Sequence, residues 1–270
     1  MGLKGMAIAA ALVAAGAATP ALAMDLASGT AIYELSLDPA KGMAGVGGTI
    51  SGRLESGLFQ VCGGYDTVTR LDAKIMPSTG GALSMKLDSD LHETKDELKF
   101  RVAGRFGLQV LQDTQGVATL TPEGVTVKVE RPDARELSLD GGPVAFPMAL
   151  ITRAIEAAKA GERFLSLRLF DGSAMEAWSV SVVIGDPRSA NESEDEKAFA
   201  AALGIGEVKR WPMKLSYFPP QAGGDTAPAF ATEGVVYENG FMLGATYDFG
   251  MFGMKLGLVE FKPAAAKACE

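Results

Sequence analysis

The sequence predicts a mainly β protein built on a many-stranded antiparallel sheet with one or two α-helices. Glycine contributes 33 of the 270 residues, about 12% against a usual ~7%, and these glycines are spread between short apolar runs. Most of the runs alternate apolar and polar residues with the period of two that is typical of strands. Helical spacing of apolar residues occurs in only two segments. We therefore expect many strands connected by turns.

Residues 1–23 have the pattern of a secretory signal peptide. Lys4 provides a positive start, an apolar stretch runs from Met6 to Ala18, and Ala21-Leu22-Ala23 offers the small residues of a cleavage site. This apolar stretch is too short to span a membrane, and no later segment approaches 18 uninterrupted apolar residues. We expect an exported chain that is not membrane-spanning, with one folded domain at 24–270.

Strand patterns begin at Ala31–Leu37, where Tyr33, Leu35 and Leu37 share one face. Four more short strands follow in the first half, each separated from the next by turn residues. They are Leu108–Leu111, Val117–Thr121, Val125–Val129 and Glu136–Leu139, with turns at Gln115-Gly116, Pro122-Glu123-Gly124 and Arg131-Pro132-Asp133.

Two segments are predicted to be helices. Between Pro147 and Lys159 apolar residues recur at helical spacing, the proline suits the first helical position, and Gly161 can end the helix. The second helix is predicted from about Ser193 to Leu203, because Ser193 and Glu196 have the spacing of a capping box.

The second half also predicts two hairpins. One joins Phe164–Phe170 to Ala177–Ile184 through Asp171-Gly172. The other joins Thr232–Glu238 to Phe241–Phe249 through Asn239-Gly240, a pair that favours a type I′ turn. Past Gly250 the apolar residues change phase, which requires a turn or bulge there.

Aromatic and methionine side chains are concentrated in this last segment. A curved sheet that carries them can enclose an apolar pocket, and flexible methionines suit variable ligands. Ordinary core packing is the competing interpretation of each residue. The candidates for binding an apolar ligand are Phe241, Leu243, Tyr247, Phe249, Phe252 and Met254.

Catalytic and metal chemistry have little support in the sequence. On a strand, Asp88, Asp90 and His92 would project from one face, as metal ligands could, but the solvated face of an ordinary strand has the same pattern. His92 is the only histidine, and no serine lies in a nucleophile-elbow motif. We expect no metal, no cofactor and no catalytic residue, although 33 acidic residues leave a carboxylate-pair hydrolase open.

Charge and cysteine content also constrain the partners. The formal net charge is −8, and it becomes −9 without the signal peptide because Lys4 is lost. An acidic chain without an evident basic patch disfavours nucleic acid and anionic membrane surfaces as partners. The two cysteines of this exported chain, Cys62 and Cys269, are expected to form one structural disulfide.

Several short motifs follow one another along the chain in a characteristic order. They are Ala31–Leu35, Cys62-Gly63-Gly64-Tyr65 with Val68-Thr69-Arg70, Phe146-Pro147, Ala157–Phe164, Phe170–Ser173, Trp211-Pro212, Leu215–Phe218, Tyr237–Gly240 and Cys269. Their order resembles that of the EipB-like cell-envelope integrity proteins, periplasmic bacterial proteins long described only as a domain of unknown function. Two motifs depart from the expected pattern: Met251 replaces a second acid, and Lys209-Arg210 replaces Arg-Ser before Trp-Pro.

This resemblance implies an open β-spiral, a half-barrel sheet wrapped partly around a helix, with a disulfide from an early strand to the C-terminus. It also implies a periplasmic role in envelope integrity and stress resistance without an assigned enzymatic activity. We expect a non-enzymatic protein that binds an apolar ligand, such as a lipid or cell-wall component, or a periplasmic protein partner. A lipid or lipoprotein carrier and an envelope hydrolase are the alternatives.

Overall fold

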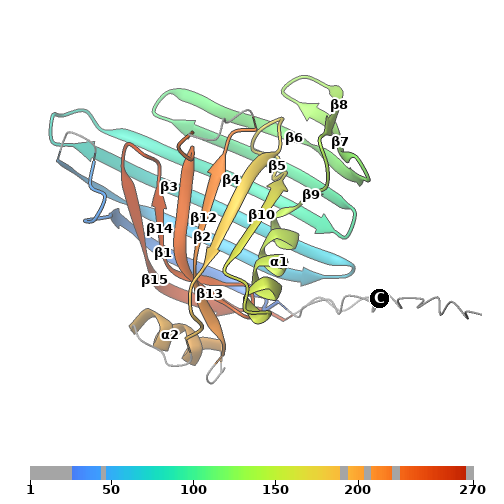
Figure 1. Ribbon diagram of the computed structural model, residues 1–270. Coiled ribbons are helices and arrows are strands. Elements are labelled where there is room, and N and C mark those ends of the chain that lie inside the picture. Colours follow the sequence, from blue (N-terminus) through green and yellow to red (C-terminus); the bar gives the residue numbers. More distant parts are fainter. Residues whose placement is uncertain (1–25, 44–46, 189–193, 204–207, 221–225, 266–270) are drawn as a thin grey trace, which may run out of the picture.

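The computed structural model describes residues 26–43, 47–188, 194–203, 208–220 and 226–265. Within these ranges one sheet of 15 strands accompanies two helices, α1 (Pro147–Lys159) and α2 (Glu194–Leu203) (Figure 1). The strands are β1 (Gly29–Leu37), β2 (Gly48–Val61), β3 (Gly64–Pro77), β4 (Leu83–Thr94), β5 (Glu97–Phe106), β6 (Gln109–Thr121), β7 (Gly124–Arg131), β8 (Arg135–Asp140), β9 (Val144–Ala145), β10 (Phe164–Leu169), β11 (Trp178–Ile184), β12 (Arg210–Phe218), β13 (Phe230–Tyr237), β14 (Met242–Asp248) and β15 (Gly253–Pro263).

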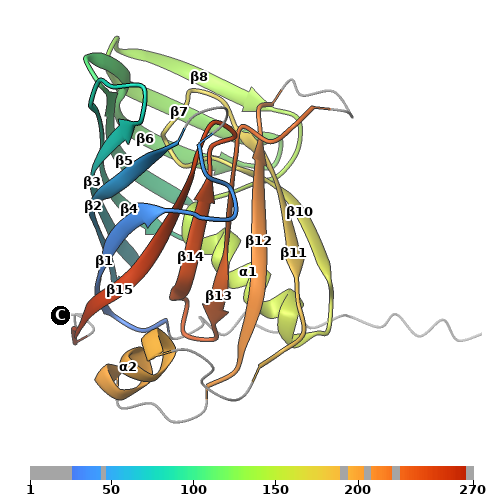
Figure 2. The same ribbon diagram turned by 90° about the vertical axis from the view of Figure 1, so that its left-hand side faces the viewer.

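The sheet has two halves that meet where the first strand pairs with the last. Its order is β8-β7-β6-β5-β4-β3-β2-β1-β15-β14-β13-β12-β11-β10-β9, and every pairing is antiparallel except that of β9 with β10. Strand β1 lies between β2 and β15, with Tyr33 opposite Leu54 on one side and Leu258 on the other. Figure 2 shows the two halves curling around α1. The predicted many-stranded, open antiparallel sheet is confirmed.

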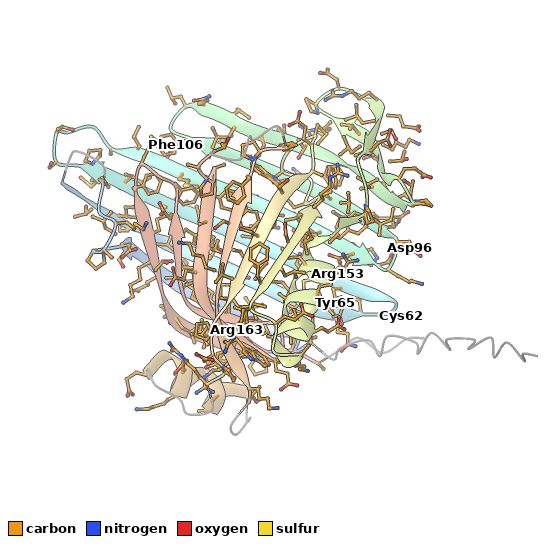
Figure 3. The ribbon with its side chains drawn as sticks, viewed as in Figure 1. Cys62, Tyr65, Asp96, Phe106, Arg153 and Arg163 are labelled. Carbon is orange, nitrogen blue, oxygen red and sulfur yellow. The ribbon has the colours of Figure 1, made fainter. Side chains whose placement is uncertain are left out.

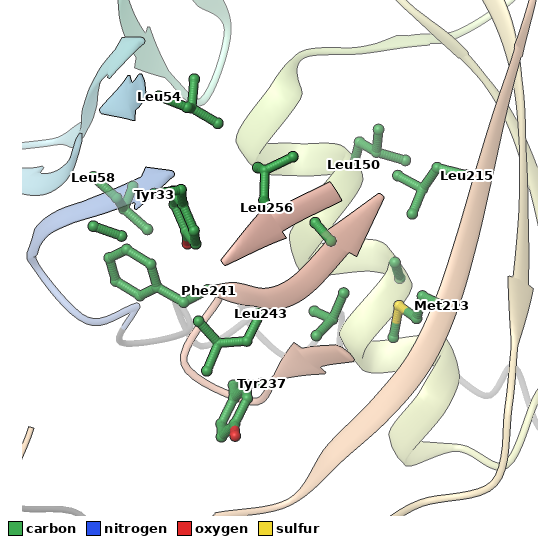
Figure 4. Close-up of a cluster of buried hydrophobic side chains, with 14 of the residues drawn as sticks. Tyr33, Leu54, Leu58, Leu150, Met213, Leu215, Tyr237, Phe241, Leu243 and Leu256 are labelled. Carbon is green, nitrogen blue, oxygen red and sulfur yellow. The ribbon is translucent and has the colours of Figure 1, made fainter. Parts of the chain in front are cut away.

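The larger core lies on the inner face of the sheet, the face that carries α1. It joins side chains from both halves to the helix, including Leu54 from β2, Leu150 from α1 and Leu215 from β12 (Figure 4). A smaller core lies between β5, β6, β7 and the segments that flank α1, where the Phe100 and Phe170 rings meet edge to face at 5.5 Å. Burial of apolar surface on this scale is the dominant stabilising term in folding.

Helix α1 has the predicted bounds, and its N-terminus is held by a side chain distant in sequence. The side chain of Phe146, the N-cap residue, makes no hydrogen bond to the first backbone N–H groups of the helix. Instead the Glu93 carboxylate of β4 accepts hydrogen bonds from the backbone N–H groups of Met148 and Ala149 at 2.7 and 2.8 Å. These groups lack partners within the helix, so the carboxylate satisfies them and fixes α1 against the N-terminal half.

Helix α2 also matches its prediction from Glu194 onward, and it packs on β14 and β15. Ser193, the predicted cap, lies outside the described residues. The Glu196 carboxylate lies 3.3 Å from the Arg210 guanidinium, and both side chains are buried. Glu196 therefore anchors α2 to β12.

Two turn predictions are wrong. Gln115-Gly116 is a bulge inside the continuous strand β6, because the register with β7 shifts between these two residues, from Arg131 to Val129. Glycine suits position 116, where a Cβ would overlap the Lys128 carbonyl of β7. The Asn239-Gly240 turn is not type I′, because only Gly240 has a positive φ, at 92°. Tyr237 and Phe241 instead enclose a three-residue loop, with glycine at its left-handed position.

Other hairpin predictions are confirmed. Strands β10 and β11 pair as expected, although their connection is longer than Asp171-Gly172 alone. A turn follows β14, with Gly250 at φ 74°, and it accounts for the predicted change of phase. The predicted signal peptide at 1–23 lies outside the described residues.

Candidate functional site

Half-buried aromatic rings form a continuous group on the inner face of the C-terminal half. We call the rings of Trp178, Tyr217, Phe230, Tyr247 and Phe249 the aromatic surface. Tyr217 and Phe230 stack with centroids 4.2 Å apart, and Trp178 meets Phe230 edge to face at 5.8 Å. Phe249 continues the stack to Phe230 at 6.4 Å and to Tyr247 at 6.2 Å. Each ring remains partly accessible to solvent.

Strand register brings these rings together. Tyr217 on β12 lies directly opposite Phe230 on β13, and Thr232 lies opposite Tyr247 on β14. Side chains two residues apart on a strand share a face. Leu215 is a core residue of β12, so Tyr217 also points to the inner face.

Polar groups lie at the edge of the aromatic surface. The Trp178 indole N–H donates to the Ser173 hydroxyl at 3.3 Å, and that hydroxyl donates to the Asp171 carboxylate at 2.6 Å. Burial raises the pKa of Asp171. Burial also raises the pKa of the Tyr217 and Tyr247 hydroxyls, so both stay protonated at neutral pH. The surface thus combines apolar rings with neutral hydroxyl groups.

The loop that carries Asp171 also contacts the N-terminal half of the sheet. The Thr114 hydroxyl of β6 donates to the Gly172 carbonyl at 2.5 Å. Gly172 has φ 74°, and a Cβ there would overlap the Phe100 ring. Glycine is therefore required for this loop to approach β5, and the loop fixes the position of the polar groups.

The six predicted ligand-binding residues are divided between the core and the aromatic surface. Phe241, Leu243 and Met254 are 5%, 1% and 0% exposed, and Figure 4 shows Phe241 and Leu243 within the core. Tyr247 and Phe249 belong to the aromatic surface. The last candidate, Phe252, is mostly buried against Phe249, with ring centroids 5.1 Å apart. Their role in ligand binding stays a prediction.

Sequence reasoning missed the other three rings, Trp178, Tyr217 and Phe230. Trp178 and Phe230 begin their strands and Tyr217 lies next to the end of β12, and the sequence does not show which rings lie opposite one another. One signal was available for Tyr217. Leu215 and Tyr217 alternate with polar residues, as on a strand with one buried face, which predicts that both side chains point to the same face.

A second, charged site lies on the outer face of β3–β7. Asp88, Asp90 and His92 do lie on one strand face, but all three contact an oppositely charged partner. His92 Nδ1 lies 2.7 Å from Asp66, and Arg70 lies 2.5 Å from Asp90 and 3.5 Å from Asp88. Among the described residues no group of three or more carboxylate, histidine or cysteine side chains could hold a metal ion. A shallow groove of about 470 Å³ passes over His92.

The predicted disulfide joins a described residue to one outside the described ranges. Cys62 lies in the tight turn between β2 and β3. Figure 3 shows it at the same end of the N-terminal half as Asp96. Cys269 lies beyond residue 265, so the bond stays a prediction.

Comparison with known proteins agrees with this architecture. The model of the EipB-like family matches residues 20–265. The chain belongs to the EipB-like family. A curated relative, the cell envelope integrity protein EipB of Brucella abortus (strain 2308), is 28% identical over 254 residues, which cover 91% of this EipB-like chain and 87% of the relative.

A solved structure supports the fold of this EipB-like protein. It is a beta-barrel-like protein of domain of unknown function DUF1849 from Brucella abortus, with a TM-score of 0.77 and 23% identity. The match covers 90% of this chain and all of that structure. No helix among the described residues is long and apolar enough to cross a membrane.

Proposed function

We propose that this EipB-like protein supports cell-envelope integrity from the periplasm, without catalysis, by holding an amphiphilic ligand on the aromatic surface. The family and the name of the curated relative support the envelope role. The ligand proposal rests on one observation: five adjacent aromatic rings on the inner face remain partly exposed, beside fully buried core residues of the same strands such as Leu215 and Leu243.

The chemistry of the aromatic surface indicates the class of ligand. The faces of Tyr217, Phe230 and Phe249 offer stacked apolar area, which favours an acyl chain or another flat apolar group. The Tyr217 and Tyr247 hydroxyls can donate hydrogen bonds to a polar head. A lipid with an uncharged or weakly charged head group near its acyl chain fits both features.

Native mass spectrometry of protein purified from its own periplasm, followed by organic extraction, tests the proposal. We expect a stoichiometric adduct that extraction identifies as an acyl lipid. A mass without any adduct, together with no rebinding of the extracted lipids, would contradict ligand binding and favour a protein-partner role.

Variants then locate the site. With N-phenyl-1-naphthylamine as an apolar fluorescent probe, Phe230→Ser should weaken binding by about tenfold or more, since a buried phenylalanine contributes about 1.5–3 kcal/mol. The matched control is Phe164→Ser, which removes a ring that is 58% exposed at the start of β10. Equal affinity of the two variants would exclude the aromatic surface as the site.

A lipid carrier differs from a static binder in releasing its ligand. Transfer of a labelled lipid from donor to acceptor vesicles, accelerated by the wild type and not by Phe230→Ser, would identify a carrier.

A further inference from the structure

Two hairpin ends lie side by side at one end of the N-terminal half. They are the β3–β4 connection, residues 78–82, and the β5–β6 turn at Gly107-Leu108. The Gly107 N–H donates to the Ser84 carbonyl at 2.7 Å, and a Cβ at Gly107 would contact Leu83. Figure 3 places Phe106 at this end of β5 and Asp96 at the opposite end.

Exposed apolar side chains are concentrated at these two hairpins. Leu108 is fully exposed, at 103% of its reference area. Of the nine large apolar side chains that are exposed among the described residues, five lie here, and we call them the apolar tip. They are Met76, Leu83, Leu108, Val110 and Leu111. Such a local cluster of exposed apolar residues marks an interaction site more often than scattered single residues do.

The two segments that form the apolar tip carry only positive charges. Residues 73–87 and 103–112 contain Lys74, Lys86 and Arg105 but no aspartate or glutamate, in a chain of net charge −8. Lys86 pairs with Asp72 at 2.8 Å. Lys74 and Arg105 are exposed, and neither forms an ion pair with another described residue. Two free positive charges therefore lie beside the exposed apolar side chains.

We infer that the apolar tip docks on the surface of a lipid bilayer with anionic head groups. Leu108 and its apolar neighbours enter the boundary between head groups and acyl chains, while Lys74 and Arg105 contact the phosphates. Apolar insertion combined with basic residues is how proteins bind a membrane surface without spanning it. The negative net charge does not prevent this, because charges farther than about 10 Å are largely screened at ~0.1 M salt.

Vesicle flotation tests the inference. The purified protein is mixed with vesicles of phosphatidylcholine alone or with 30% phosphatidylglycerol. We expect binding to the anionic vesicles that weakens as salt rises. Leu108→Asp should reduce it at least tenfold, and Lys74→Gln or Arg105→Gln about fivefold each. Because the Leu108 side chain is fully exposed, replacing it should leave folding intact.

The control is Val259→Asp, which adds the same charge at a valine that is 57% exposed on β15. It should bind anionic vesicles as the wild type does. Equal loss in both variants, or no binding to either vesicle, would overturn the inference. A tip that instead joins two copies would give a concentration-dependent dimer in sedimentation, abolished by Leu108→Asp, with no vesicle binding; that result also overturns it.

Discussion

The buried carboxylate that caps α1 should make stability depend on pH. Burial is the main cause that raises the pKa of Glu93 to about 7, and the hydrogen bonds from Met148 and Ala149 lower it less. An unfolded glutamate has a pKa near 4.5. Between these values the folded state holds a proton that the unfolded state releases. The free energy of unfolding therefore falls as pH rises through this range.

The magnitude follows from the difference between the two pKa values. Each pKa unit corresponds to about 1.4 kcal/mol, so the wild type should lose about 3 kcal/mol of unfolding free energy from pH 4.5 to above pH 7. The partial positive charge at the N-terminus of α1 favours the carboxylate and reduces this loss. Glu93→Gln cannot titrate and should lack this contribution.

Urea unfolding of both proteins at several pH values from 4.5 to 8.5, followed by tryptophan fluorescence, isolates the effect. The stability of the wild type minus that of Glu93→Gln should decrease by about 3 kcal/mol and level off above pH 8. Glu136→Gln, at an exposed position of β8, is the control and should give a flat difference. A difference that rises with pH would refute the reasoning, because the helix N-terminus would then outweigh burial.

Three further outcomes are expected. Cys62→Ser and Cys269→Ser should lower the melting temperature equally, each by the equivalent of about 2–5 kcal/mol, and equal stability of the reduced and oxidised protein would contradict the disulfide. Arg210→Met should cost about 3–5 kcal/mol in urea unfolding because it removes the guanidinium that lies 3.3 Å from the buried Glu196 carboxylate, and a second change, Glu196→Gln, should restore part of that. His92→Ala should preserve both stability and envelope stress resistance, whereas lost resistance in a stable protein would support the hydrolase alternative.

The sequence was sufficient to predict α1 and most C-terminal hairpins, because each of them is specified by local signals. Pro147 and Gly161 delimit one periodic segment, and Asn239-Gly240 marks a hairpin even though its turn type was wrong. The long strands β2 to β5 were largely missed. Their inner positions include polar residues such as Thr67 and Thr69, which interrupt the apolar alternation.

The candidate site was only partly predictable for a related reason. Tyr247 and Phe249 lie in one strand pattern, so the sequence places them on one face. Tyr217 stacks on Phe230 only because of the register set across the β12–β13 connection, which no local rule specifies. Likewise, the basic residues around the apolar tip come from three different strands, and they lie close together only because those strands pair in the sheet.

The pairing of β1 with β15 also constrains how the protein can fold. All other neighbours among the described strands are consecutive in the chain, and most of these pairs form from nearby segments as hairpins. Tyr33 and Leu258, in contrast, are 225 positions apart. Contacts of such long range form slowly, and until they form the edge of β1 is open to pairing with other chains. Strand β1 cannot complete its pairing until β15 has been synthesised. We therefore expect folding of this chain to depend on a chaperone that protects the open edge of β1.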